Sequence, residues 1–454
     1  MSLLHGWLPI TIQVLAAIVL FAAIGWRSRR WRLLWVPVAA LAGVVLAALV
    51  YRYIVYQSWS QDPAPVTLWL WIALTGVAVV VVLAGWRGIG WWRRVVSILA
   101  IPLCVLCAAL ALNIWVGYVP TVRSALDLAT GTESPRWVDQ STLADMQQRG
   151  VRPTQGVVVR VTIPDTGSGF LHRQELVYLP PAWFATTPPP KLPVVMMFAG
   201  EFGRADDWLR GANALTVLDE FTAKHRGNAP IVVFPDTWGD FNNDTECVNG
   251  PRGNAADHLT KDVVPFVIST FGASSDPANW GLLGWSSGGT CALMLAGLHP
   301  ELFSAFVDID GQLGPNAGTR EQTVARLFGG DEAAWAAFDP KTVITQHGPY
   351  SGMSAWFGVS SDTPTVFHAG DRTGQASAPP SDWDTNSEDH ATIANALCSL
   401  ISGYGIECAV TSTHASHDFA GAGDGFAAAL PWLAGKIGTP GVHPISLPGA
   451  PAGE

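Results

Sequence analysis

The stretch Gly284-Trp285-Ser286-Ser287-Gly288 decides how the C-terminal part of this chain is interpreted. It matches the pattern G-x-S-x-G, in which a serine lies on a sharp turn between a strand and a helix. Residues 280–283 form an apolar run that predicts a buried strand, and residues 290–298 predict a helix. Glycines suit this turn because larger side chains would collide with the neighbouring strand and helix. We therefore predict a nucleophile elbow, with the Ser286 hydroxyl as nucleophile and the Ser287 N–H as an oxyanion donor.

Apolar strands and helices alternate on both sides of this motif. A hairpin is predicted over residues 156–179, and a fully apolar strand follows at residues 192–200. Further strand–helix units continue to a last helix near residues 419–437. Such alternation predicts a mainly parallel sheet with helices on both faces. A hairpin followed by strand–helix units is the layout of the α/β-hydrolase fold, which we assign to residues 156–454.

The partners of the serine are expected after it, in the order acid and then histidine. His417 follows the last predicted strand and is assigned as the general base, with His414 as its nearest competitor. Asp371 follows a strand predicted at residues 365–370 and is assigned as the acid that orients the imidazole. The second oxyanion donor is assigned to the N–H of Glu201, in the loop after the first parallel strand.

The region after Asp371 leaves alternatives open. Further carboxylates there could be the true partner of the histidine, namely Asp382, Asp384, Glu388 and Asp389. His390, at the start of the next helix, is expected to be solvated. Residues 240–244 superficially resemble a calcium loop, but the following glycine and the distal glutamate are missing. The pattern therefore does not predict a metal site at these residues.

Residues 312–362, between two predicted strands, are where this fold commonly inserts a lid. Trp335 and Trp356 lie in apolar segments of this region. Exposed in a lid, they would line a channel for an acyl chain; buried, they would be ordinary core, and the sequence does not separate the two. We predict that one of these tryptophans contacts the acyl chain.

The first 117 residues have a different composition from the rest. Four apolar runs each approach the ~20 residues of a membrane-spanning helix. These runs are residues 8–26, 33–51, 66–86 and 95–116. Arginines fill the first and third connections, so the positive-inside rule places these in the cytoplasm and both ends of the bundle outside. We therefore predict a four-helix transmembrane region at 1–117, a linker at 118–155 and an extracytoplasmic domain at 156–454, in a multi-pass protein of the plasma membrane.

Charge and cysteine content fit an exported domain. Residues 1–117 carry eight arginines and one aspartate, so the net charge of −10 for the whole chain leaves −17 for the remainder. Such acidity disfavours nucleic acid as a partner. Four cysteines in this part allow three disulfide pairings. Cys398 and Cys408 flank a helix–strand turn, which by elimination leaves Cys247 to pair with Cys291.

Three segments resemble the esterase-D family of α/β-hydrolases, which includes the mycolyltransferases of the mycobacterial cell envelope. They are residues 198–208, Gly284–Gly289 and His417-Asp418-Phe419. The resemblance covers residues 156–438 and implies a triad of Ser, Asp or Glu, and His that needs no cofactor. It also places the second oxyanion donor at Glu201. The four-helix region is not part of the family pattern.

Together these observations predict a membrane-anchored serine esterase or acyltransferase that acts through an acyl-enzyme on acyl esters of the cell envelope, either lipids or acylated sugars. Two alternatives belong to other classes. One is a catalytically inactive hydrolase fold that serves as a binding or scaffold protein. The other is a transporter with an exported regulatory domain, which is disfavoured because the apolar runs contain no acidic residue or lysine.

Overall fold

The computed structural model describes residues 1–25, 27–57, 64–86, 90–132, 136–360, 366–368, 389–413 and 415–450. The chain divides into two compact units, residues 1–132 and 133–454. The predicted linker at 118–155 is therefore shared between them. Helix α5 (Val122–Thr130) belongs to the first unit, whereas strand β1 (Trp137–Asp139) and helix α6 (Gln140–Gln148) belong to the second.

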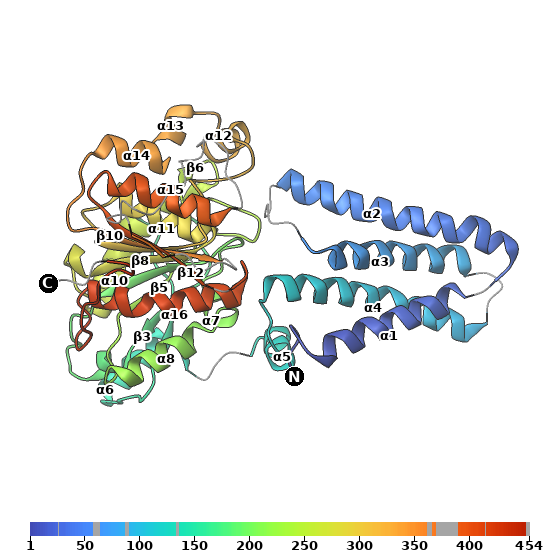
Figure 1. Ribbon diagram of the computed structural model, residues 1–454. Helices are drawn as coiled ribbons and strands as arrows, with labels where there is room; N and C mark the ends of the chain where they lie inside the picture. Colours follow the sequence, from blue (N-terminus) through green and yellow to red (C-terminus); the bar gives the residue numbers. More distant parts are fainter. Residues whose placement is uncertain are drawn as a thin grey trace. The chain divides into compact units, whose positions relative to one another are not determined.

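The N-terminal unit contains four helices that are long and apolar enough to span a membrane (Figure 1). They are α1 (Trp7–Ile24), the π-helical turn η1 (Trp31–Trp35) continued by α2 (Val36–Gln57), α3 (Val66–Gly85) and α4 (Trp91–Val116). Small residues bring α2 and α3 together, because a Cβ atom at Gly76 would lie 2.8 Å from the Cα of Gly43. Close approach through glycine is typical of helix pairs in membranes.

The C-terminal unit is built on a ten-stranded sheet with the order β1-β2-β3-β5-β4-β8-β9-β10-β12-β11. Strand β3 pairs antiparallel with β2 and β5, and β11 pairs antiparallel with β12, whereas the other pairs are parallel. The strands are β2 (Val157–Val161), β3 (Glu175–Leu179), β4 (Val194–Phe198), β5 (Ile231–Phe234), β8 (Trp280–Trp285), β9 (Ala305–Ile309), β10 (Ser354–Ser360), β11 (Val366–His368) and β12 (Glu407–Thr413). The predicted α/β-hydrolase fold is confirmed.

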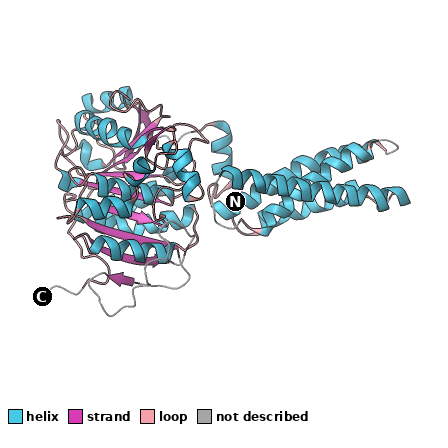
Figure 2. Cartoon of the chain, turned by 90° about the horizontal axis from the view of Figure 1, so that it is seen from above, coloured by secondary structure: helices cyan, strands magenta, loops and turns pink. Residues whose placement is uncertain are grey.

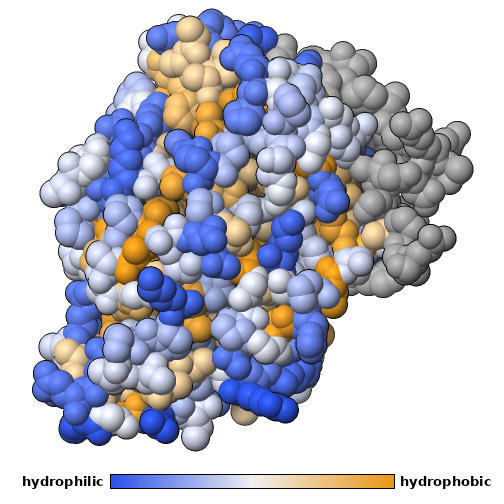
Figure 3. Space-filling view, turned by 90° about the vertical axis from the view of Figure 1, so that its left-hand side faces the viewer, coloured by the Kyte–Doolittle hydropathy of each residue, from blue (hydrophilic) through white to orange (hydrophobic). Residues whose placement is uncertain are grey.

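Helices cover both faces of this sheet (Figures 1 and 2). One face carries α11 (Ser287–Leu298) and α15 (His390–Ser402), and the other carries α8 (Ala214–Lys224) and α16 (Phe419–Lys436). Shorter elements connect them: η2 (Pro181–Phe184), α7 (Asp207–Arg210), β6 (Asn249–Gly250), β7 (Gly253–Asn254), α9 (Ala255–Asp257), η3 (His258–Val263), α10 (Val264–Phe271), η4 (Pro277–Asn279), α12 (Arg320–Phe328), α13 (Glu332–Ala336) and α14 (Pro340–His347). The outer surface mixes hydrophilic and hydrophobic residues on the face shown in Figure 3.

Strand β10 was not predicted, and it changes the sheet near the site. The expected lid region contains α12, α13 and α14 but ends in β10, which pairs in parallel with both β9 and β12. The strand predicted at residues 365–370 is β11, a short antiparallel strand at the sheet edge. A strand is thus present where one was predicted, and β10 separates β9 from β12 in the sheet.

Both predicted disulfides are confirmed. Cys247 pairs with Cys291, and Cys398 pairs with Cys408, each with a Cα–Cα distance of 5.7 Å. The first links the loop that precedes β6 to α11, the helix that begins at the elbow. The second closes the turn between α15 and β12.

Candidate active site

Ser286 lies at the tip of a sharp turn between β8 and α11, as predicted. Its φ of 58° and ψ of −128° are uncommon for a residue with a side chain, and its N–H donates to Ile309 O at 2.8 Å. A Cβ atom at Gly284 would collide with the carbonyl oxygen of Gly288, and one at Gly288 would collide with that of Phe198. The motif glycines are therefore required by the close approach of strand and helix.

His417 faces this serine from the loop between β12 and α16. Its Nε2 lies 3.2 Å from Ser286 Oγ, within reach for proton transfer. The structure thus brings together two residues that are 131 positions apart in the sequence. The competing His414 lies outside the described residues.

Asp310 lies on the other side of the histidine, and the sequence analysis did not identify it. Its Oδ2 is 3.4 Å from His417 Nδ1, a contact longer than a strong hydrogen bond. The carboxylate is fully buried and accepts hydrogen bonds from Ser360 N at 2.7 Å and from Ser360 Oγ at 2.6 Å. Its position directly after β9, the strand beside the elbow strand, was the available signal. Asp371 lies outside the described residues.

The environment of Asp310 favours its ionised form. Burial alone would raise the pKa of this carboxyl, but the hydrogen bond and charge of His417, the charge of His390 and the Ser360 hydroxyl lower the pKa below its ordinary value. Asp308, two residues earlier on β9, behaves in the opposite way. Burial and then the charge of Asp310 raise the pKa of Asp308 to about 8, so it is mainly protonated at neutral pH.

The two predicted oxyanion donors lie next to the serine. Ser287 is the first residue of α11, and the first amides of a helix have no acceptor within it. Glu201 lies in the turn after β4, and a Cβ atom at the preceding Gly200 would be 3.3 Å from Ser286 Cβ. Arg173 Nη2 donates to the carbonyl oxygens of Phe202 at 3.1 Å and Gly203 at 2.8 Å. This arginine therefore fixes the backbone of the turn.

Arg173 is itself held by a buried carboxylate. Asp236, which is fully buried, accepts from Arg173 Nη2 at 2.6 Å and from Arg173 N at 2.5 Å. Burial alone would raise the pKa of Asp236, but the hydrogen bonds and charge of Arg173 lower it. The ion pair thus remains intact near neutral pH.

Two further aromatic rings contact the ring of His417. The ring of His390 is stacked on it at a centroid distance of 4.7 Å and an angle of 9°, and the ring of Trp285 lies 5.0 Å away at 38°. His390 begins α15 and is 7% exposed, so the expectation that it would be solvated was wrong. The sequence could not show that this helix starts against the site.

A buried glutamate, Glu246, and a half-buried aspartate, Asp244, border the turn that carries Glu201. Burial raises the pKa of Asp244 to about 6. Burial, followed by the charge of Asp244, raises the pKa of Glu246 well above its ordinary value. Glu246 Oε2 accepts from Asn316 N at 3.2 Å, and the charge of Glu201 contributes to its shift. The pair therefore carries less than two negative charges at neutral pH.

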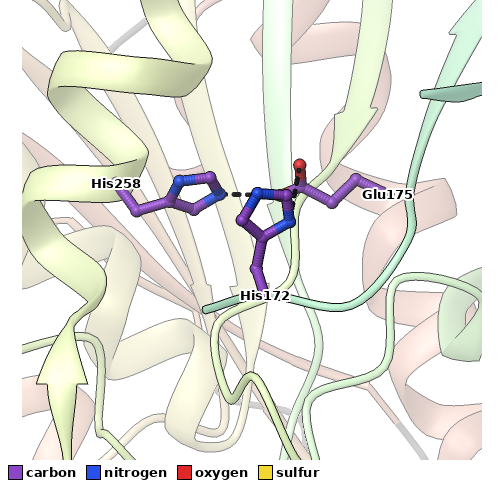
Figure 4. Close-up of side chains that lie close together, drawn as sticks. All are labelled: His172, Glu175 and His258. Atoms are coloured by element: carbon purple, nitrogen blue, oxygen red, sulfur yellow. Dashed lines mark hydrogen bonds and ion pairs between the residues drawn. The ribbon is translucent and has the colours of Figure 1, made fainter. Parts of the chain in front are cut away.

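Two clusters among the described residues bring three potential metal-ligand atoms within 4.8 Å of one another. In the first, the stacked rings of His172 and His258 lie beside Glu175 (Figure 4). Both nitrogens of His172 face carbonyl oxygens at 2.8 Å, and both nitrogens of His258 face carboxylates, at 3.0 Å from Glu175 and 3.2 Å from Asp262. Each ring nitrogen of the pair therefore already faces an oxygen of the protein, so none of the four is directed at an open coordination position.

The second cluster consists of Asp310, His390 and His417. The two rings are almost parallel, so the lone pairs in their planes run side by side and do not converge on one point. This arrangement suits stacking and proton transfer better than the convergent coordination of a metal ion.

The two predicted acyl-chain tryptophans lie in different settings. Trp356 is on β10, 8% exposed, and its ring is 5.8 Å from that of Trp432 on α16. Trp356 pairs with Val307 on β9, and Val307 in turn pairs with Leu283 on β8. Leu283 comes three residues before Ser286, so Trp356 lies about 10 Å from the serine along the strand direction. Trp356 is therefore core. Trp335 is half-buried on α13, with the Arg320 guanidinium 4.3 Å above its ring, and its contact with an acyl chain stays a prediction.

The sheet order, the elbow and the serine–histidine hydrogen bond define a serine hydrolase of the α/β-hydrolase class. The family described as "Putative esterase" matches residues 172–381. An uncharacterized protein of Corynebacterium glutamicum is 32% identical over 371 residues, covering 79% of this chain and 84% of that protein. The chain belongs to this esterase family, as its resemblance to esterase-D proteins implied.

Solved structures with similar folds are more distant. A ferulic acid esterase has a TM-score of 0.46 at 14% identity, covering 62% of this chain and 99% of its own. An S-formylglutathione hydrolase of Agrobacterium tumefaciens has a TM-score of 0.45 at 16% identity, and the match covers 62% of this chain and 95% of that protein. MPT51 of Mycobacterium tuberculosis has a TM-score of 0.37 at 16% identity, and the match covers 61% of this chain and 99% of that protein. With TM-scores below 0.5, these similarities add nothing to the assignment.

Proposed function

We propose that this chain is a membrane-anchored esterase or acyltransferase whose hydrolase unit acts on acyl esters at the outer side of the cell membrane. The observation that carries the proposal is the 3.2 Å hydrogen bond between His417 Nε2 and Ser286 Oγ. A base at this distance can take the hydroxyl proton as the oxygen attacks a carbonyl carbon.

In the proposed reaction, Ser286 Oγ attacks the ester carbonyl and His417 takes its proton. Asp310 stabilises the resulting imidazolium, the role that the sequence assigned to Asp371. The N–H groups of Ser287 and Glu201 hold the oxyanion. His417 then returns the proton to the departing alcohol, which leaves an acyl-enzyme. Water or an acceptor hydroxyl, activated by the same histidine, takes the acyl group and frees the serine.

The proposed location is supported by the N-terminal unit and the disulfides. Helices α1 to α4 could hold the chain in a membrane, and the arginine-rich connections favour an external hydrolase unit. Disulfides persist in oxidising compartments, and both pairs lie in the hydrolase unit. The 79% coverage shared with the Corynebacterium glutamicum protein exceeds what residues 133–454 alone can supply, so that relative shares part of the N-terminal unit.

Replacement of the nucleophile tests the proposal directly. In the full-length protein, Ser286→Ala should abolish turnover of p-nitrophenyl acetate and labelling by a fluorophosphonate, which reacts only with an activated serine. The control is Ser269→Ala, at an exposed serine of α10 whose hydroxyl bonds only its own helix, and it should behave as the wild type. Turnover that survives in Ser286→Ala would refute the assignment, and a wild-type protein that resists labelling would favour the inactive scaffold.

A further inference from the structure

We propose that His390 is a positioning residue, whose ring holds the imidazole of His417 in the plane that joins Ser286 and Asp310. The inference rests on the proposed function, because it assigns a partner to the proposed base. His390 has no place in the predicted triad, and it does not itself reach the reacting serine through any contact described above.

Hydrogen bonds alone hold the His417 ring loosely. Its contact with Ser286 is 3.2 Å and its contact with Asp310 is 3.4 Å, and neither is a short bond. The terminal torsion of a histidine has a broad energy well, so weak contacts leave its ring free to swing. Stacking at 4.7 Å and 9° removes much of this freedom, because rotation of the ring would drive its edge into His390.

His390 is well placed for this role because its own position is fixed. It is the first residue of α15, and the side chain of Asp389 caps that helix by accepting from Thr392 N at 3.1 Å. The ring is 7% exposed, and its Nδ1 lies 3.4 Å from the carbonyl oxygen of Gly311. Gly311 directly follows Asp310, so the chain segment that supplies the carboxylate also contacts the stacking ring.

The arrangement also couples the charges of the two rings. The carboxylate of Asp310 lies close to both imidazole rings, since one atom of each of the three side chains lies within 4.8 Å of the other two. A charge on His390 would therefore oppose the imidazolium that His417 must form during acyl transfer. Among the described residues, the other titratable groups nearby are Asp308 on β9, beside Asp310, and Asp418, which caps the N-terminus of α16 and follows His417. Replacement of His390 by a residue without charge would therefore leave the carboxylate of Asp310 to His417 alone.

Two substitutions separate the ring from its charge. His390→Ala removes the ring and should lower kcat for p-nitrophenyl acetate by about tenfold or more, with KM within about twofold, because a misplaced base slows the chemical step. His390→Phe keeps a flat ring and should retain kcat within about threefold near pH 8. In this variant the acid limb of kcat/KM should move to higher pH, because no second positive charge then opposes protonation of His417.

A stacked histidine away from the site provides the control. The His347 ring lies on that of Tyr350 at 4.2 Å and 17°, at the end of α14, and His347→Ala should leave kcat and the pH profile unchanged. Wild-type kcat in His390→Ala would overturn the inference. So would an equal loss of kcat in both variants with an unmoved acid limb, since His390 would then serve folding only. If His390→Ala does not fold, His390→Leu, which fills the space without a flat ring, takes its place and should show the same loss of kcat, and wild-type kcat in that variant would overturn the inference.

The experiment also separates this inference from the proposed function. If Ser286→Ala keeps its turnover, the proposed function fails whatever the His390 variants do. If Ser286→Ala is inactive and the His390 variants match the wild type, only the role of His390 is refuted.

Discussion

Replacement of Asp310 by asparagine tests which carboxylate serves His417. Asp310 Oδ1 accepts from Ser360 N at 2.7 Å, whereas Oδ2 faces both Ser360 Oγ and His417 Nδ1. In Asp310→Asn, the amide oxygen would keep the bond to Ser360 N, so the amide NH₂ would take the place of Oδ2. His417 Nδ1 would then have to accept, and the ring proton would move to Nε2, where it points at Ser286 and blocks the base.

Loss of the acid through a wrong histidine tautomer costs about 10⁴-fold in kcat, or ~5.4 kcal/mol. Because the present contact is 3.4 Å, we expect a loss of about 10³- to 10⁴-fold, or ~4 to 5.4 kcal/mol. The assay is kcat for p-nitrophenyl acetate, with thermal unfolding to show that the variant is folded. The control, Asp371→Asn, should stay within about threefold. If Asp310→Asn keeps more than a tenth of the wild-type kcat while kcat of Asp371→Asn falls by about 10³-fold or more, the assignment of Asp310 is wrong.

Three other results are expected. Burial alone would lower the pKa of His258, but the carboxylates of Glu175 and Asp262 raise it in the folded protein. The protonated ring therefore stabilises the fold fully below about pH 6.5, the pKa of histidine in the unfolded chain, and this stabilisation is lost as the pH rises through the higher pKa of the folded state. The unfolding temperature should therefore fall with rising pH in the wild type and fall less in His258→Gln; parallel curves would refute this. Cys291→Ala opens a bridge between residues 44 positions apart and should lower the free energy of unfolding by about 4 kcal/mol in denaturant titrations without reductant. Reductant also opens the Cys398–Cys408 bridge, so it should lower the free energy of unfolding of the variant further, and an unchanged stability of Cys291→Ala would refute this expectation. A phosphatase reporter fused after Tyr118 should be active in cells and one fused after Gly88 inactive; the reverse pattern would place the hydrolase unit in the cytoplasm.

The sequence was informative wherever a local pattern determines structure. The elbow could be predicted because its glycines, its apolar strand and its helix are contiguous, and the disulfides because Cys398 and Cys408 flank a short turn. His417 could be found because the loop after the last strand is where this fold presents its base. Each of these predictions depends on neighbours along the chain.

The carboxylate beside His417 could not be found in this way, because strand pairing determines which residue lies there. Residues 354–360 contain serine, glycine and two large aromatic residues, so no alternation marks them as a strand. Only the pairing of β10 with β9 and β12 shows that Asp310 and Ser360 end neighbouring strands. The burial of His390 is equally non-local, because it depends on where α15 meets the sheet.

The clamp formed by Arg173 has a consequence for how substrate preference can change. Arg173 donates hydrogen bonds to the carbonyl oxygens of Phe202 and Gly203 in the turn after β4, so it holds the main chain of the turn without contacting the side chain of Glu201 through these bonds. The side chain of Glu201 can therefore be exchanged while the main chain of the turn stays in place, whereas Phe202, with a φ of 70° and a ring stacked on Phe241, is less free to change. Libraries randomised at Glu201 should remain rich in active enzymes with altered selectivity, whereas libraries randomised at Arg173 should be depleted of activity, so Glu201 is a position at which the enzyme can evolve.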